Sequence, residues 1–181
     1  MSASLLARRM VDGLSDTARA EMDATLADLS AGGRSDLVAV FRSLLDGQDM
    51  SVALGLPAGT ADLLYAQAHA RFNAGNVTDA LALFQALAAL SPKVKDHWLG
   101  LGICLRMTGV FAGARLAFAA ALDLQPDCAA VTYHMAELAL ADGRREEAVV
   151  LVRRFFALPD GGLKTRLSAE AQRLAAVLTA S

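Results

Sequence analysis

Apolar residues in the middle of the chain follow the 3.6-residue period of helices that bury one side. The pattern is clearest in residues 95–128, where it predicts one helix before Gly109 and a second between Gly109 and Pro126. The two apolar stripes hold Trp98, Leu101, Gly102 and Leu105 in the first helix, and Ala114, Phe118 and Ala121 in the second. A glycine inside a helix costs about 0.5–1 kcal/mol relative to alanine. We therefore expect Gly102 to serve packing, and if it faces Ala114 the two helices can approach closely there.

This helical hairpin recurs with a period of 34 residues, since Gly75, Gly109 and Gly143 are spaced by that number. The same spacing relates further sets of residues, namely Ala80, Ala114 and Ala148; Phe84, Phe118 and Val152; and Pro92 and Pro126. Trp–x2–Leu–Gly, then Ala–x3–Phe, then Pro, at this period is the tetratricopeptide pattern. We therefore predict an all-α, tetratricopeptide-repeat superhelix of three helix-turn-helix repeats. The repeats are expected at 61–94, 95–128 and 129–162, with helices at 61–74, 77–90, 95–108, 111–124, 129–142 and 145–158.

The ends of a repeat stack need elements that cover their apolar faces. The repeats are expected to form one domain, 59–181, that ends in a capping helix at 163–181. The predicted apolar stripe of that helix is Leu163, Leu167, Ala171, Leu174 and Leu178. Thr60 is expected to cap the first repeat helix.

Residues 1–58 are predicted to form an N-terminal helical extension. Its expected helices are a short one at 4–11, one that follows the N-cap Ser15, one that begins at Ser35 or Asp36 and ends near Gly47, and a single turn within 50–57. Three interpretations of this extension stay open: a dimer contact, a lid, and a cap on the first repeat.

Charge and hydropathy exclude two classes of partner. A net charge of −2 gives no basic field for nucleic acid. The longest stretch without a charged residue, about 80–92, is shorter than the roughly 20 apolar residues that span a bilayer. No signal-peptide pattern opens the chain. We expect a cytoplasmic protein that does not insert into membranes, although its mean hydropathy of +0.38 implies apolar surface that something covers.

No pattern of reactive residues indicates catalysis or metal binding. Cys104 and Cys128 form neither a disulfide framework nor a metal motif, and Cys104 is expected to be a small buried residue. His69, His97 and His134 lack the spacing of zinc ligands. Phosphate-binding, dinucleotide-binding and serine-hydrolase motifs are missing as well. We predict no catalytic residues, no metal and no cofactor.

The first helix of each repeat carries more apolar residues than hairpin packing requires. A surface helix normally has one apolar face, yet Leu99, Ile103 and Met107 form a second stripe in the middle repeat. In tetratricopeptide solenoids the first helices line the concave surface, so these positions predict a groove for an extended peptide. The candidate groove residues are Tyr65, His69, Phe72, Asn73, Leu99, Ile103, Arg106, Met107, Tyr133, His134 and Glu137. Of these, Tyr65, Phe72 and Tyr133 are expected to be exposed in the groove.

Three motifs in these helices point to one family. Leu64-Tyr65 opens the first repeat, Leu99-Gly100-Leu101-Gly102 with Cys104 marks the second, and Tyr133-His134-x-Ala136-Glu137 marks the third. With these motifs the sequence resembles the class II chaperones of bacterial type III secretion, the SycD/LcrH type. The resemblance implies a cytoplasmic, all-helical homodimer. Its concave groove would bind an N-terminal segment of a hydrophobic translocator protein, keeping that protein soluble and competent for export.

A second hypothesis is a generic tetratricopeptide adaptor or scaffold. Such adaptors commonly grip the terminal carboxylate of a client with Lys, Arg and Asn side chains of the first helices. The groove positions of this chain offer mainly Asn73 and Arg106 for that purpose. An enzyme or a metal protein is a third hypothesis, which no motif supports.

Overall fold

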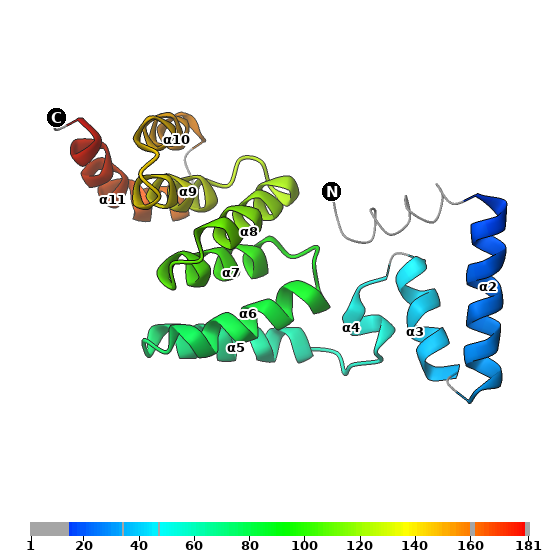
Figure 1. Ribbon diagram of the computed structural model, residues 1–181. Coiled ribbons are helices and arrows are strands. Elements are labelled where there is room, and N and C mark those ends of the chain that lie inside the picture. The colour runs from blue at the N-terminus through cyan, green and yellow to red at the C-terminus, as the bar shows by residue number, and fades with distance from the viewer. Residues whose placement is uncertain (1–14, 34, 47, 160–161, 180–181) are drawn as a thin grey trace.

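The computed structural model describes residues 15–33, 35–46, 48–159 and 162–179, and in these ranges the chain folds into helices without strands (Figure 1). Six of the helices form three hairpins stacked in chain order. Their bounds are α5 Thr60–Asn73 with α6 Val77–Leu90, α7 Lys95–Met107 with α8 Phe111–Leu124, and α9 Ala129–Ala141 with α10 Arg145–Ala157. Each end lies within one residue of the predicted one. The predicted fold of three helix-turn-helix repeats is therefore confirmed.

The turn inside each hairpin is the same, which explains the period of the glycines. Gly75, Gly109 and Gly143 have φ values of 81°, 79° and 73°, in the left-handed region that residues with a Cβ avoid. In the first turn, the amide of Asn76 donates to the carbonyl of Arg71 and the amide of Gly75 donates to that of Phe72. This pair of bonds is the Schellman motif, which satisfies the last carbonyls of a helix and reverses the chain.

The predicted N-cap at Thr60 is wrong by one residue. Gly59, with φ of 84°, is the N-cap of α5, and Thr60 is the first residue of the helix. The hydroxyl of Thr60 donates to the carbonyl of Pro57 at 2.7 Å, so it stabilises the turn before the helix and not the helix amides.

The N-terminal extension contains the helices that the sequence predicts after Ser15. These are α2 (Asp16–Ala31), α3 (Ser35–Leu45) and the single turn α4 (Met50–Ala53). They lie at the end of the molecule opposite the C-terminal helix, and α4 contacts α6 (Figure 1). The predicted helix at 4–11 lies outside the described residues. The division at residue 58 stays a prediction.

Helix α7 lies between α6 and α8, the second helices of the first and second hairpins. Two of its glycines each contact a phenylalanine ring from one of these helices. A Cβ on Gly100 would lie 2.3 Å from the ring of Phe84 of α6, and a Cβ on Gly102 would lie 2.5 Å from the ring of Phe118 of α8. Each ring therefore rests directly on the backbone of α7. The close approach expected at Gly102 exists, but its nearest partner is the ring of Phe118 and not Ala114.

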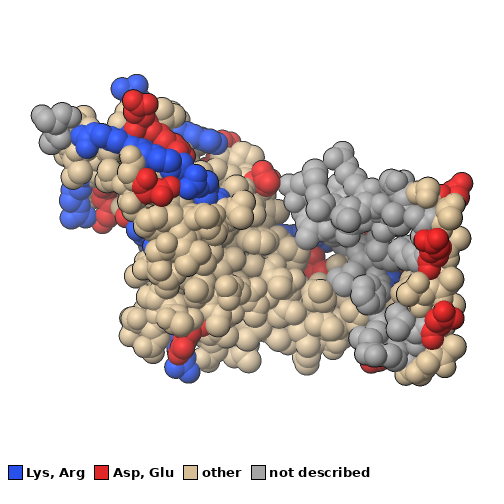
Figure 2. All heavy atoms as spheres, in the orientation of Figure 1, with Lys and Arg blue, Asp and Glu red and all other residues tan. Residues whose placement is uncertain are grey.

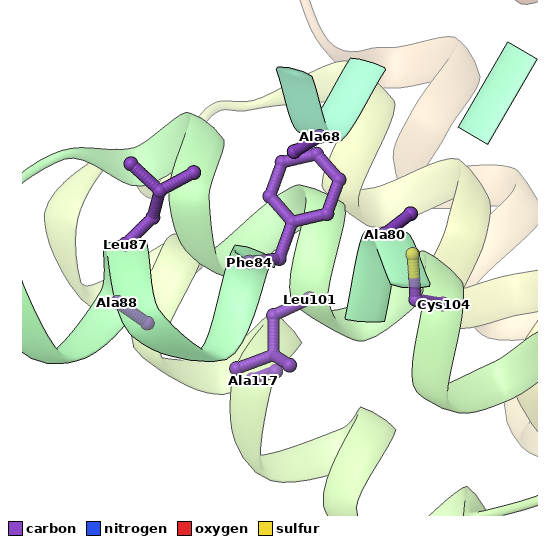
Figure 3. Close-up of a cluster of buried hydrophobic side chains, with 8 residues drawn as sticks. All are labelled: Ala68, Ala80, Phe84, Leu87, Ala88, Leu101, Cys104 and Ala117. Carbon is purple, nitrogen blue, oxygen red and sulfur yellow. The ribbon is translucent and has the colours of Figure 1, made fainter. Parts of the chain in front are cut away.

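Figure 3 shows the side chains around Phe84, where residues of four helices meet. The ring lies beside Ala68 of α5. Leu101 and Cys104 of α7 and Ala117 of α8 belong to the same buried cluster. Cys104 is fully buried and free, as predicted, and burial raises the pKa of its thiol to about 11. This cluster joins the first hairpin to the second.

Helix α11 (Gly162–Thr179) covers the open end of the third hairpin, as predicted for a capping helix. Ala171 and Leu178 are buried among residues of α9 and α10, and Leu167 and Leu174 pack beside them. The side chain of Leu163, the remaining residue of the predicted stripe, lies outside those described. The guanidinium of Arg145 at the start of α10 donates to the carbonyls of Val177 and Leu178, which ties down the end of α11.

The packing of Phe118 on α7 predicts opposite effects for two glycine-to-alanine changes. Gly102→Ala should destabilise the protein by about 1–3 kcal/mol, the usual cost of overpacking, because its Cβ meets a fully buried ring. Gly113→Ala in α8 is the matched control, since its Cβ would lie 3.3 Å from side-chain atoms of Leu105 and Val110, which need to shift by only a few tenths of an ångström. The gain of up to about 1 kcal/mol in helix propensity should then leave it neutral or more stable. Urea unfolding followed by circular dichroism measures both. Equal effects of the two changes would contradict the ring-on-backbone packing.

His97, in the first turn of α7, is buried at the junction of the first two hairpins. The residue is 4% exposed, and its Nδ1 lies 3.2 Å from the carbonyl oxygen of Ser91. Because a carbonyl only accepts, Nδ1 carries the proton in this bond. Burial lowers the pKa of His97, and the hydrogen bonds to backbone carbonyls only partly offset this effect.

The lowered pKa of His97 predicts a loss of stability in weak acid. Just below pH 6.5, the ordinary pKa of histidine, His97 takes up a proton in the unfolded chain but stays neutral in the folded chain. The free energy of unfolding should therefore fall as the pH drops from 6.5 through the pKa of His97 in the folded chain. Above 6.5 this contribution is fully present. His97→Asn keeps a donor near Nδ1 and does not titrate. Unfolding at pH 7.5 and 5.5 should show a larger loss in the wild type than in the variant, and equal losses would exclude His97 as the source.

Candidate peptide-binding groove

A small apolar hollow opens between the first helices of the first two hairpins. It is lined by His69 and Phe72 of α5, Phe84 of α6, and Gly100 and Ile103 of α7. The ring of Phe84 reaches the hollow because Gly100 has no side chain in its path. Its cavity volume is about 40 Å³, far below the 300–1,000 Å³ typical of small-molecule pockets. The hollow therefore suits one apolar side chain of a longer ligand.

Tyr65 borders this hollow through a cluster of aromatic rings. Its ring centroid lies 4.5 Å from that of His69, 6.1 Å from that of Phe84 and 5.7 Å from that of His97. Tyr65 and Phe72 are partly exposed, and His69 is exposed. Burial, and after it the charge of Asp96, raises the pKa of the Tyr65 hydroxyl. The phenol therefore stays neutral at neutral pH.

Four side chains form a hydrogen-bonded network farther along the same face, between α7 and α9. Glu137 forms an ion pair with Arg106 at 3.1 Å and accepts hydrogen bonds from His134 Nδ1 at 2.8 Å and from the hydroxyl of Tyr133 at 3.1 Å. Burial alone would raise the pKa of Glu137, but the hydrogen bonds from His134 and Tyr133 and the charge of Arg106 together lower it. Burial and the charge of Glu137 raise the pKa of Tyr133 to about 12. Glu137 is thus a stable carboxylate at neutral pH.

The prediction that Tyr133 is exposed in the groove is wrong. Tyr133 is 6% exposed and packs with Phe155 and Ala171 between α9, α10 and α11. Tyr133 is equivalent to Leu99 one repeat earlier and to Tyr65 two repeats earlier. Each of these two side chains packs against the following hairpin: Leu99 against the third hairpin, and Tyr65 against α7 of the second. In the third repeat α11 takes the place of the following hairpin. Tyr133→Ala would therefore test the stability of the fold and not peptide binding.

The other predicted groove residues separate into two groups. Asn73 and Met107, at the ends of α5 and α7, are exposed. Leu99 and Ile103 are half-buried against the cluster that joins the second and third hairpins, and Ile103 also lines the hollow. Of the predicted residues, the structure thus brings His69, Phe72 and Ile103 together in one hollow, and Arg106, Tyr133, His134 and Glu137 in one network.

Two residues of the hollow, Phe84 and Gly100, are missing from the predicted site. Phe84 follows the repeat pattern of a core residue, and it is both a core residue and the floor of the hollow. The sequence could have indicated Gly100, because a second glycine inside the same helix, two residues from Gly102, is costly unless it allows close packing. Which ring would lie on it depends on the angle between hairpins, which the sequence pattern does not specify.

Charged side chains are unevenly distributed over the molecule. On the face that Figure 2 shows, they gather over the end formed by α9, α10 and α11, whereas the part over α5 to α8 carries few. Helix α6 contains a single charged residue, Asp79, and α8 contains two, Arg115 and Asp123. None of the helices in the described ranges combines the length and hydropathy needed to span a bilayer. In the same ranges, no group of three or more His, Cys, Asp or Glu residues could hold a metal ion.

Comparison with known proteins identifies the repeats. The model of the tetratricopeptide repeat family matches residues 65–127 and 108–161, which together exceed half of the chain. No curated protein matches the sequence significantly.

Solved structures of similar fold come from bacterial type III secretion. PcrH of Pseudomonas aeruginosa, in complex with the chaperone binding region of PopD, is 28% identical over 70% of this chain and 96% of its own, with a TM-score of 0.64. A type III secretion complex from Aeromonas hydrophila contains a chain 25% identical over 77% of this chain and 94% of its own, with a TM-score of 0.68.

The chaperone SycD of Yersinia enterocolitica, in complex with a peptide of the translocator YopD, is 23% identical over 68% of this chain and 95% of its own, with a TM-score of 0.62. At this identity the structural similarity to SycD supports the fold alone. A second SycD structure is described as an alternative dimer. The resemblance to translocator chaperones that the sequence motifs predict is confirmed by this set of structures.

Proposed function

We propose that this chain, which belongs to the tetratricopeptide repeat family, is a chaperone of type III secretion that binds an extended segment of a hydrophobic translocator protein. The observation that carries the proposal is the apolar hollow between α5 and α7, which is open and sized for one side chain of a longer ligand. The complex of PcrH, 28% identical, with the chaperone binding region of PopD supports this choice of client.

The mechanism is capture and shielding without catalysis. An extended client segment lies across the first helices and inserts an apolar side chain against the ring of Phe84. Covering this segment and the hollow together removes apolar surface that would otherwise promote aggregation or membrane insertion. We place this step in the cytoplasm, before export of the client, and expect no cofactor to take part.

The alternative, an adaptor that grips a terminal carboxylate, has little support in the network around Glu137. Arg106, its main candidate cation, is already paired with Glu137 at 3.1 Å. Asn73 is exposed but contributes no charge. A client carboxylate would have to displace an existing ion pair, so the adaptor ranks second. Binding that depends on a free client C-terminus, and that amidation abolishes, would favour the adaptor.

Substitutions at the hollow should weaken client binding without unfolding the protein. Probes are overlapping 20-residue amidated peptides that cover the translocators encoded in the same genome, measured by fluorescence anisotropy. Phe72→Ala should weaken the best peptide at least tenfold, since buried aromatic anchors dominate such interfaces. His69→Asp, which places a charge at the rim, should do the same.

Leu116→Asp provides the matched control for these variants. Leu116 is 73% exposed on α8, a second helix that contributes no residue to the hollow, so this change should leave peptide affinity unaltered. Circular dichroism confirms that each variant is folded. A peptide that binds all four proteins equally well would exclude the hollow as the site, and a complete lack of binding peptides would refute the proposed client.

We propose further that the chain forms a homodimer through the outer face of its first repeat. Leu63 on α5 is 64% exposed, although its equivalents one and two repeats later, His97 and Val131, are 4% and 0% exposed. Ala70 is exposed as well, whereas its equivalents one and two repeats later, Cys104 and Leu138, are buried. In the second and third repeats the preceding hairpin covers these positions. On the first repeat the same face is therefore exposed and can pack against a helix. The dimer described for SycD supports a second copy as the occupant.

Leu63→Glu should convert the dimer into a monomer, because it places a charge at the centre of this face. Sedimentation equilibrium at micromolar concentration measures the change, with Leu116→Glu as a control of similar exposure on another surface. A wild type that is monomeric, or a dimer that survives Leu63→Glu, would contradict this interface.

A further inference from the structure

The first hairpin is attached to the rest of the stack on one side only. The second hairpin packs against both of its neighbours, and α11 covers the far side of the third. On the first hairpin the single turn α4 contacts α6, but the far face of α5 is open, with Leu63 64% exposed. Segments with fewer buried contacts open before the rest of a protein unfolds. The junction between the first two hairpins therefore controls whether α5 and α6 can separate from the stack.

His97 of α7 is buried in this junction by groups that belong to the first hairpin and its end. The ring of Tyr65 on α5 lies 5.7 Å from the imidazole, centroid to centroid. The backbone carbonyls of Leu87, in the last turn of α6, and of Ser91, just after that helix, accept hydrogen bonds from the imidazole. Separation of α5 and α6 from α7 removes these groups and leaves the imidazole in water.

The repeat pattern shows that the fold does not need a histidine at this position. The equivalent residue one repeat later is Val131, which is fully buried at the junction of the second and third hairpins. An aliphatic side chain therefore fills the position there without titrating. Of the two junctions between hairpins, only the first carries an ionisable group at this position.

The charged and titratable groups around His97 come from α5 and α7. Helix α5 contributes Asp62 and Tyr65, and α7 contributes Lys95 and Asp96, which pair at 2.9 Å. The single charged residue of α6 lies in its first turn, whereas His97 meets the last turn. Burial outweighs the two carboxylates and the bonds to carbonyls, so the pKa of His97 is lowered while the junction is closed. Once the imidazole is in water, its pKa returns to about 6.5.

We propose that His97 makes the first hairpin acid-sensitive: in weak acid α5 and α6 separate from α7 more often, because the freed imidazole binds a proton, while the later helices stay folded. Lowering the pH from 7.5 to 5.5 should raise the opening equilibrium up to about tenfold, since one proton is taken up in each opening. The inference holds whatever the client is. It bears on the hollow because Phe72 of α5, Phe84 of α6 and Ile103 of α7 surround it only in the closed state.

Amide hydrogen exchange of the full chain, followed by mass spectrometry at pH 7.5 and 5.5, tests the proposal. Exchange is expressed as protection factors, which correct for the slower chemical exchange in acid. In the wild type, the protection of α5 and α6 should fall about three- to tenfold more than that of α9, α10 and α11. His97→Val, which gives the first junction the residue of the second, should remove this difference.

His97→Asn is the second variant, because it keeps a hydrogen-bond donor near the carbonyl of Ser91 and does not titrate. Circular dichroism at pH 7.5 shows which variants are folded. A selective loss of protection in α5 and α6 that disappears in a folded variant supports the proposal. Equal losses in all helices of the wild type would overturn it, because the opening would then be global. A selective loss that persists in the folded variants would overturn the role of His97.

Discussion

The structure depends on two phenylalanine rings that lie on the backbone of one helix. Phe84 and Phe118 approach α7 from opposite sides, and each occupies the volume that a Cβ on Gly100 or Gly102 would need. These contacts fix the distance and angle between successive hairpins. They also decide what remains open on the inner face: the ring on Gly100 leaves a hollow above it, whereas the ring on Gly102 leaves room that His134 fills. One packing device thus generates both the stability of the stack and the shape of the groove.

Most of the fold could be predicted because its determinants are local. The glycine at the left-handed position of each hairpin turn recurs every 34 residues, and the helices between follow a 3.6-residue period, so their ends are predicted within one residue. The misassigned cap at Thr60 has a local cause as well, since Gly59 takes the N-cap and the hydroxyl of Thr60 bonds to Pro57.

Fewer features of the site could be predicted, because contacts between neighbouring hairpins determine which of its side chains are exposed. The sequence places Tyr65 and Tyr133 at equivalent positions, yet Tyr65 is half-buried beside the hollow and Tyr133 is covered by α11. The sequence pattern assigns Arg106, His134 and Glu137 to the groove, but their mutual bonds follow from distances across α7 and α9. Phe84 was missed for the same reason, since a core ring becomes part of a surface only where the neighbouring residue is glycine.

The most direct measurement is a crystal structure of the wild-type chain with the tightest-binding translocator peptide. The structure of the groove predicts an extended peptide across α5 and α7, with one apolar side chain against Phe84 between Phe72 and Ile103, and with the Arg106–Glu137 pair intact beside it. A peptide seated on the outer face over Leu116, or a hollow left empty in the complex, would contradict the assignment of the groove.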